Sequence, residues 1–236
     1  IVSALNLDVK VTEPDISPLA IQGPKSELLA SRLFGSKITN LKLFDIESFN
    51  FAGEKLLIAK SGYSKQGGYE IYVNGPKIAI KLWDALFEEG KAFNVRAGCP
   101  NLIERIEGGL LSYGNDMTIE NTPFECGLGK FLQEKIPNEC ISARALNSDK
   151  IRDPKKIIRS ISINYKEKIY CESIWKVVDE KNNYVGQITS GAFSPDFNKI
   201  VALGMINKDC ANNKNRLFTL INGKKYLIHI HEKPFI

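Results

Sequence analysis

The chain has few of the residues that build metal sites, and it lacks long apolar segments. It contains two histidines, His229 and His231, and its five cysteines show no CxxC spacing. A structural zinc ion takes four closely grouped ligands, so we expect no metal site. The longest apolar runs, such as residues 200–206, are far shorter than the roughly 20 residues of a transmembrane helix. We therefore expect no membrane partner.

A strong excess of one charge is also absent. The 32 basic and 27 acidic residues give a net charge of +5, and the basic residues are spread along the chain. Nucleic-acid-binding domains carry a clustered basic patch, so we expect no nucleic-acid partner. The odd cysteine count favours reduced thiols and a cytoplasmic location. Cys99 and Cys126 are predicted to be small buried residues.

Several catalytic fingerprints are missing as well: the P-loop, the Rossmann glycine motif, the nucleophile elbow and the zinc-protease helix. An enzyme with this sequence would depend on positioning and on a bound cosubstrate. The chain begins at Ile1 rather than Met, with strand-like alternation over residues 1–11. We therefore expect it to be a piece of a longer protein.

The first part of the chain mixes helix and strand patterns. Pro24, Pro76 and Pro100 each stand where a helix is expected to begin, and the first of these helices is expected to end at Gly35. Strands are predicted over residues 41–51 and 54–59, joined by a turn at positions 52 and 53. This mixture predicts an α+β domain.

From residue 157 onward the pattern changes to short strands separated by turns rich in Gly, Asn and Asp. The predicted strands are residues 157–163, 169–178, 184–189, 199–206, 216–221 and 225–231. Their close spacing predicts a small β-barrel or sandwich. We place the boundary in the charged segment 148–156, which gives an α+β domain over residues 1–147 and a β-barrel domain over residues 148–236.

The stretch KSGYSKQGGYEIYVNG, residues 60–75, combines a glycine-bearing turn with aromatic residues and an acid at the start of a strand. From the residues alone, Glu70 could be a solvated carboxylate, and Tyr63 and Tyr72 could be ordinary surface aromatics. Four stretches of the chain, in this order, resemble the aminomethyltransferase family of the glycine-cleavage T-protein: SPLAIQGP (17–24), SGYSKQGGYEI (61–71), RIEGG with YGND and PFE (105–125), and GQITSGAFSP (186–195).

The resemblance implies a partial folate-binding domain, a C-terminal barrel and tetrahydrofolate as cosubstrate. Glu70 matches the glutamate that anchors the pterin ring, since a carboxylate can accept both of the neighbouring pterin N–H donors. Tyr63 and Tyr113 are implied to contact folate, and Tyr63 and Tyr72 to contact the substrate. The glycines of the turn are expected to let the backbone approach the flat ring.

Within the family, the sequences of residues 64–73 and 98–107 resemble those of the dimethylsulfoniopropionate demethylases. Asn101 stands where T-proteins carry a folate-holding Arg, although Tyr63 stands where the demethylases carry Trp. The resemblance implies a tetrahydrofolate-dependent methyltransferase that takes a methyl group from a sulfonium donor. Two alternatives stay open: a glycine-cleavage aminomethyltransferase and a non-catalytic folate-binding module. The resemblance places the catalytic Asp of the family in an N-terminal part that this chain is expected to lack, so no catalytic residue is assigned. A homodimer is considered as a possible assembly.

The other motif residues have structural interpretations. Arg105 and Glu107 are predicted to form an ion pair that orders a helix. Tyr113, with Asn115 and Asp116, suits an Asx-type turn. Glu125 is expected to cap a helix start. Ser190 and Ser194 are expected in a turn, and without a nearby histidine they are not interpreted as nucleophiles.

Overall fold

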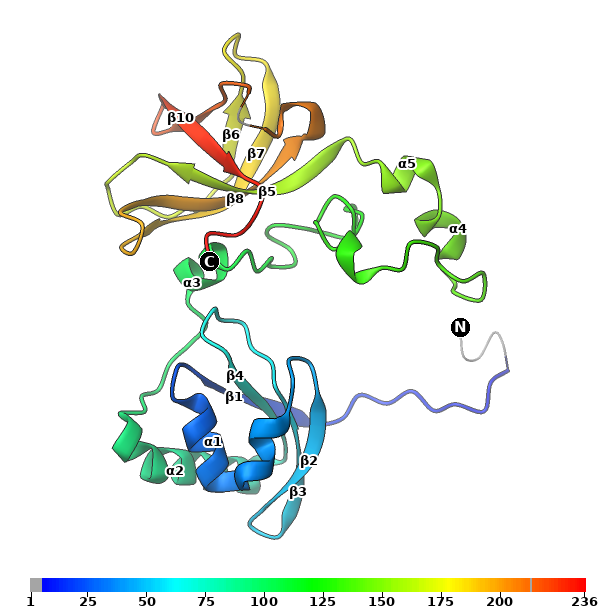
Figure 1. Cartoon of the computed structure of the whole chain (residues 1–236), viewed down its shortest axis with the longest axis vertical. Helices are drawn as coiled ribbons and strands as arrows, with labels where there is room; N and C mark the ends of the chain where they lie inside the picture. Colours follow the sequence, from blue (N-terminus) through cyan, green and yellow to red (C-terminus); the bar gives the residue numbers. More distant parts are fainter. Residues whose placement is uncertain (1–5, 213) are drawn as a thin grey trace. The chain divides into compact units, whose positions relative to one another are not determined.

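The computed structural model describes residues 6–212 and 214–236. The strands are β1 (Ile16–Gln22), β2 (Ile46–Phe51), β3 (Glu54–Ala59), β4 (Gly68–Asn74), β5 (Lys156–Ile163), β6 (Trp175–Val178), β7 (Tyr184–Ser194), β8 (Lys199–Asn207), β9 (Phe218–Ile221) and β10 (Lys224–His231) (Figure 1). The helices are α1 (Ser26–Phe34), α2 (Pro76–Gly90), α3 (Leu102–Glu107), α4 (Ala143–Leu146) and α5 (Asp149–Arg152), with short 3-10 turns at Ser36–Asn40, Lys91–Phe93, Gly129–Phe131 and Lys208–Cys210.

Several predicted element ends need correction. β2 begins at Ile46 rather than at residue 41, and α3 begins at Leu102 rather than at Pro100, with Asn101 as its N-cap. Residues 6–11 form no strand, and residues 1–5 of the predicted strand lie outside the described residues. Helix α1 begins at Ser26 rather than at Pro24, because the turn that leaves β1 extends through residue 25. Its end at Gly35 is as predicted, and Gly35 has a positive φ of 85° that favours glycine.

By its internal contacts the chain divides into two compact units. The first contains residues 1–62 and 66–99, and the second contains residues 63–65 and 100–236. Helix α3 therefore groups with the barrel strands. The predicted domain boundary between residues 147 and 148 stays a prediction.

The first unit has a four-stranded antiparallel sheet in the order β1-β4-β3-β2. The turn predicted between β2 and β3 is present, with φ of 50° at Ala52 and 87° at Gly53, as a tight hairpin requires. Helices α1 and α2 lie against each other and against β4 (Figure 1). Pro76 begins α2 as predicted, and Ile78, Leu82 and Leu86 form its buried stripe.

The two faces of this sheet differ because side chains alternate along a strand. On β4, Tyr69, Ile71 and Val73 are at most 1% exposed and belong to the core beneath the helices. Glu70 and Tyr72 point to the opposite face and are half-buried. The helix-free face of the sheet therefore carries the polar and aromatic residues of the motif.

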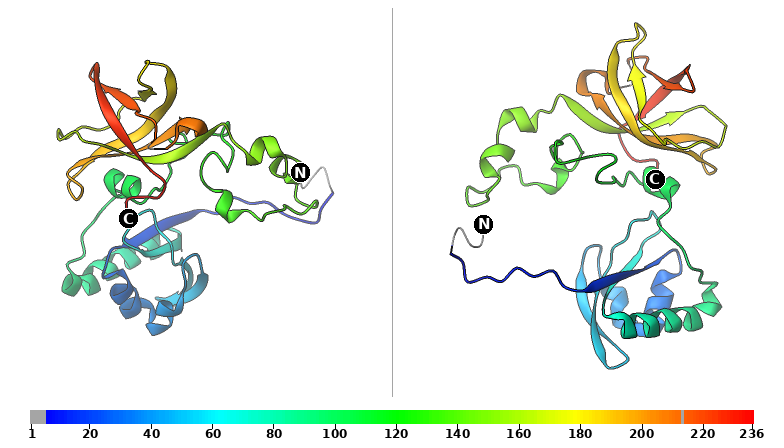
Figure 2. Two further views of the ribbon diagram at one scale, coloured as in Figure 1. Left: turned by 45° about the horizontal axis from the view of Figure 1, so that its top comes forward. Right: turned by 180° about the vertical axis from the view of Figure 1, so that it is seen from behind.

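In the second unit, six strands close into an antiparallel barrel in the order β10-β5-β8-β7-β6-β9 (Figure 2). The predicted strands are confirmed with changed ends: β6 begins only at Trp175, and β7 continues to Ser194. Ser190 and Ser194 thus lie on a strand, not in the turn that the glycine and proline of their motif suggested. Ile106 of α3 packs on the barrel with Ala192, Val201 and Leu203.

Gly186, the first residue of the GQITSGAFSP motif, lies where β7 and β8 approach closely. A Cβ at this position would lie 2.4 Å from the carbonyl oxygen of Met205 and 2.8 Å from Cα of Ile206. Backbone atoms cannot move aside as the end of a flexible side chain can. Only glycine therefore fits here without a shift of one strand.

We expect Gly186→Ala to lower the free energy of unfolding by about 1–3 kcal/mol through overpacking. Gly98→Ala is the matched control, because a Cβ at position 98 would meet no atom within 4 Å. Denaturant unfolding of both variants measures the difference. Equal stability of the two variants would contradict the close approach of β7 and β8.

Candidate functional site

Glu70 and Tyr72 share one face of strand β4 in the first unit. Glu70 pairs with Ala20 of β1 and with Ala59 of β3, and Tyr72 pairs with Pro18 and Leu57. Residues that pair across strands lie on the same face. The acid is therefore flanked by two alanines and the ring by two apolar side chains, which leaves room above Glu70 for a flat group.

The hydroxyl of Ser61 donates a short hydrogen bond to Oε2 of Glu70. Within the described residues, this is the only hydrogen bond or ion pair of the Glu70 carboxylate. A carboxylate offers about four lone-pair sites, so most of its acceptor capacity is left for a ligand.

The side chain of Gln22 occupies the space beside two glycines of the turn. A Cβ at position 62 would lie 2.0 Å from Oε1 of Gln22, and one at position 68 would lie 2.6 Å from Nε2 of Gln22 and 2.1 Å from the carbonyl oxygen of Ile21. Nε2 of Gln22 also donates to the carbonyl oxygen of Ser61 at 3.1 Å. Gly62 and Gly68 are thus required by the protein's own packing, independently of any ligand.

The other two predicted ligand residues, Tyr63 and Tyr113, belong to the second unit. The hydroxyl of Tyr63 donates to the carbonyl oxygen of Leu111 at 2.7 Å, and its side chain is 37% exposed. Tyr113 is 70% exposed and forms an isolated bridge with Met117. Tyr63 therefore has a fixed hydroxyl and a partly accessible ring, whereas Tyr113 is a surface residue of this unit.

The predicted ion pair between Arg105 and Glu107 is wrong. Arg105 instead pairs with Asp116, with 2.8 Å between Nη1 and Oδ2. Both residues are at most 6% exposed. Residues two positions apart on a helix point in different directions, so Arg105 and Glu107 have separate partners.

Asp116 is the centre of a buried hydrogen-bond network in the second unit. Its Oδ2 accepts from Arg105 and from the backbone N–H of Ser112 at 2.9 Å, which confirms the predicted Asx-type capping. Its Oδ1 accepts from the hydroxyls of Thr189 at 2.7 Å and Ser190 at 2.5 Å. All four acceptor positions are used, as a buried charge requires.

Ser190 completes this network. Its hydroxyl accepts from Nη2 of Arg105 and from Nδ2 of Asn115, each at 2.7 Å, while it donates to Asp116. A hydroxyl has one proton and two lone pairs, so its bonding capacity is filled. This agrees with the expectation that Ser190 is not a nucleophile.

A second buried acid, Glu107, joins three parts of the same unit. It is 1% exposed, accepts from the hydroxyl of Ser194 at 2.5 Å and forms an ion pair with Lys65. The hydrogen bond to Glu107 raises the pKa of Lys65, which also lies 3.3 Å from Asp196. Lys65 was not among the residues singled out from the sequence, because nothing local identifies its distant partner.

Two smaller predictions are resolved. Glu125 accepts from the backbone N–H of Thr122 at 2.8 Å, and Thr122 accepts from the N–H of Glu125, so the expected cap is a capping box. It stabilises a turn rather than a regular helix. Cys126 is buried as predicted, and burial raises the pKa of its thiol; Cys99 is exposed, contrary to prediction.

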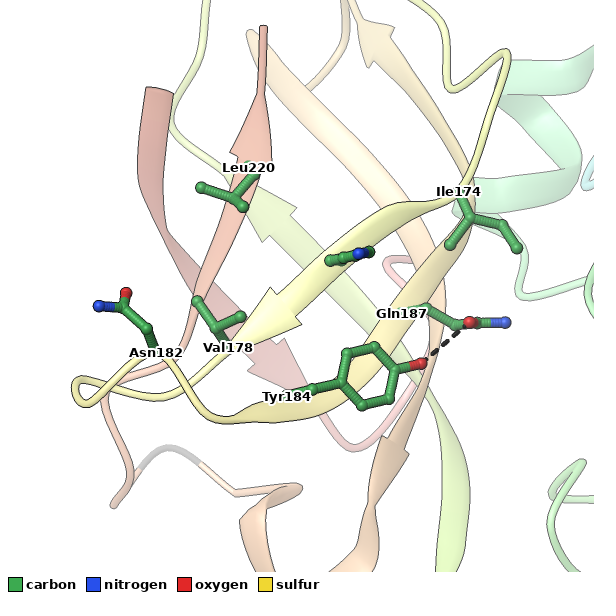
Figure 3. A pocket seen from close by; sticks show the side chains of 7 residues that line it. Ile174, Val178, Asn182, Tyr184, Gln187 and Leu220 are labelled. Atoms are coloured by element: carbon green, nitrogen blue, oxygen red, sulfur yellow. Dashed lines mark hydrogen bonds between the residues drawn. The ribbon is translucent and has the colours of Figure 1, made fainter. Parts of the chain in front are cut away.

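A groove of about 780 Å³ lies on the outer wall of the barrel, between β6, β7 and β9 (Figure 3). It is lined by Ile174, Lys176, Val178, Asn182, Tyr184, Gln187 and Leu220, and the Tyr184 hydroxyl donates to Oε1 of Gln187 at 3.0 Å. None of the predicted ligand residues lines it.

The described residues contain no group of three or more His, Cys, Asp or Glu side chains able to hold a metal ion. Nor does any helix among them have the length and apolar character needed to cross a membrane.

Comparison with protein families identifies the fold. The GCVT N-terminal domain matches residues 1–135, and the glycine cleavage T-protein C-terminal barrel domain matches residues 162–236. The chain belongs to the glycine cleavage T-protein family. The expected α+β architecture followed by a C-terminal barrel is thereby confirmed.

Individual relatives fall into two named groups. The chain is 46% identical over 205 residues to dimethylsulfoniopropionate demethylase DmdA of Ruegeria pomeroyi, covering 87% of this chain and 55% of that protein. It is 28% identical over 228 residues to an aminomethyltransferase of Porphyromonas gingivalis, covering 94% of this chain and 61% of the relative. The chain thus spans less than two thirds of the length of these relatives.

A solved structure shares the fold. Glycine cleavage system aminomethyltransferase T from Bartonella henselae superposes with a TM-score of 0.74 at 24% identity, covering 93% of this chain and 59% of that structure.

We expect Asp116→Asn to lower the free energy of unfolding by about 3–5 kcal/mol, because it leaves the buried Arg105 without a counter-charge. Glu180→Gln is the control, since Glu180 forms an exposed pair with Arg216 at 3.2 Å and surface pairs contribute at most about 1 kcal/mol. Denaturant unfolding measures both. A loss of less than about 1 kcal/mol for Asp116→Asn would mean that the network is not a major source of stability.

Proposed function

We propose that the protein carrying this chain is a tetrahydrofolate-dependent methyltransferase that demethylates a sulfonium compound such as dimethylsulfoniopropionate. The observation that carries the proposal is the presentation of Glu70 and Tyr72 on the helix-free face of the sheet, within a motif typical of the family. The higher identity to a demethylase than to aminomethyltransferases supports the choice of substrate.

Glu70 has the properties that a pterin-binding acid needs. Its carboxylate keeps free lone pairs in the described part of the chain, and small alanine neighbours leave its face open. Charge-assisted hydrogen bonds from two adjacent N–H donors would orient a pterin edge against it. The residues present therefore suit tetrahydrofolate. When bound, this cosubstrate supplies N5 as the nucleophile for the methyl carbon.

The aromatic residues are assigned to the methyl donor. Tyr72, on the sheet of the first unit, offers a ring face to a sulfonium cation. Tyr63 of the second unit, whose hydroxyl donates to Leu111, is the other aromatic residue assigned to the donor. A cation over such a ring is stabilised by about 1–2 kcal/mol where water is excluded. In the transfer, the S–CH3 bond breaks and an N–CH3 bond forms. The sulfide leaves as a neutral thioether and the nitrogen proton passes to solvent, so no general acid is required.

Alignment of the reactants then supplies most of the rate, because holding them in contact can be worth up to about 7–11 kcal/mol. This mechanism suits a chain in which the buried hydroxyls of Ser190 and Ser194 donate to the structural acids Asp116 and Glu107.

The alternative aminomethyl transfer is less well supported. Asn101 occupies the position of the T-protein arginine, and its Oδ1 accepts from the N–H of Ile103 at 2.9 Å as the N-cap of α3. An amide used as a helix cap supplies no positive charge for a folate carboxylate.

The complete protein, incubated with dimethylsulfoniopropionate and tetrahydrofolate, is expected to produce 5-methyltetrahydrofolate and the demethylated thioether in equal amounts. Chromatography with mass detection measures both products. Ammonia release that requires a lipoylated carrier protein would identify an aminomethyltransferase instead. Folate binding without transfer from either donor would identify a non-catalytic module.

Glu70→Gln is expected to weaken tetrahydrofolate binding by about 1–3 kcal/mol, because the neutral amide loses one acceptor and the charge. Glu54→Gln is the control, since Glu54 is exposed at the β2–β3 hairpin. Titration calorimetry under anaerobic conditions gives both affinities. Unchanged affinity in Glu70→Gln would remove Glu70 from the folate site.

A further inference from the structure

The turn between β3 and β4 is built around the end of β1. Gln22 pairs with Gly68 in the β1–β4 ladder, and the N–H of Gly23 donates to the carbonyl oxygen of Gly67 at 3.0 Å. Gly67 has a φ of 74°, which favours glycine. The part of the turn that leads into β4 is therefore tied to the end of β1 by backbone hydrogen bonds.

The part of the turn that follows β3 is held by the side chain of Gln22, at the end of β1. Nε2 of Gln22 donates to the carbonyl oxygen of Ser61, and the amide fills the volume that a Cβ on Gly62 would need. Gln22 thus lies between the two parts of the turn and fixes the backbone of Ser61 relative to β4. A side chain at position 62 or 68 would clash with the amide of Gln22 and displace it.

The fixed backbone of Ser61 has a consequence for Glu70. The Ser61 hydroxyl donates to Oε2 of Glu70, so one carboxylate oxygen has a defined direction. An unrestrained glutamate has several rotatable bonds, and ordering it on binding a ligand costs conformational entropy. A carboxylate that is already oriented avoids most of that cost.

We propose that Ser61 and Gln22 are positioning residues for the pterin-binding carboxylate: Gln22 fixes Ser61, and Ser61 orients Glu70. This inference rests on the proposed folate-binding function of Glu70. It adds two requirements, a hydroxyl at position 61 and an amide donor at position 22. Neither follows from the sheet register or from the glycine pattern.

The test measures tetrahydrofolate binding to the complete protein by anaerobic titration calorimetry. Ser61→Ala is expected to weaken binding about 3- to 10-fold, the effect of one lost hydrogen bond. Ser61→Thr keeps the hydroxyl and is expected to bind within about 2-fold of the wild type. Ser48→Ala, an exposed serine on β2 of the same sheet, is the matched control and is expected to change nothing. Equal binding by the Ala and Thr variants would overturn the role of Ser61.

A double-mutant cycle separates positioning from a general structural effect. In the Glu70→Gln background, Ser61→Ala is expected to cause little further loss of binding, because the charged carboxylate that Ser61 orients is already gone. The same fold-loss in both backgrounds would overturn the proposal. If Glu70→Gln itself leaves binding unchanged, the proposed folate-binding role of Glu70 fails. If only Ser61→Ala leaves it unchanged, the positioning role fails and the folate-binding role of Glu70 stands.

Gln22 is tested by Gln22→Met, which keeps the length of the side chain but removes the N–H donor. Binding is expected to fall by a factor similar to that of Ser61→Ala. The thermal unfolding midpoint is recorded in parallel, so that a loss of folding is distinguished from a loss of positioning. A variant that folds and binds as the wild type does would overturn the role of Gln22.

Discussion

The alternation of side chains along β4 is the constraint on which the first unit depends. Tyr69, Ile71 and Val73 must enter the core beneath α1 and α2, so Glu70 and Tyr72 have to face the other way. A slip of one residue in register would bury the acid and expose the isoleucine, at a cost of several kcal/mol for an unpaired buried charge. The core of this unit therefore fixes the direction of the residues assigned to the ligand. One strand thus supplies core residues of this unit and the residues that we propose bind the ligand.

The second unit uses buried charge in a different way. Its two conspicuous motifs, RIEGG and GQITSGAFSP, are joined by Arg105–Asp116–Ser190 on one side and by Glu107–Ser194 on the other. Each acid accepts several hydrogen bonds, which compensates for the loss of hydration. The polar residues of these two motifs thus hold α3 against the barrel.

Much of the fold follows from local signals. Pro76 with apolar residues at four-residue intervals predicts α2 with its correct ends, and short alternating runs predict all six barrel strands. The errors fall where a local signal competes with a distant partner. A proline after β1 suggested an early helix start. The glycine and proline of SGAFSP suggested a turn, yet pairing with β8 keeps residues 190–194 in β7. The partner of Arg105 could not be predicted, because eleven positions and a turn separate it from Asp116.

The candidate site was predictable to a similar degree. Glu70 and Tyr72 were found from the motif, and their shared face follows from strand periodicity. The contacts of Ser61, Gln22 and Lys65 were not predicted, since each depends on a partner that is distant in the sequence. The close fit of Gln22 beside Gly62 is evident only from the three-dimensional structure.

The ion pair of Lys65 with Glu107 also limits how this protein can diverge. A neutral or acidic residue at position 65 would leave the carboxylate of Glu107, which is 1% exposed, without its counter-charge. Substitutions of Lys65 that remove the positive charge are therefore expected to be destabilising. The rings at positions 63 and 72, which we propose contact the substrate, can vary without leaving Glu107 uncompensated.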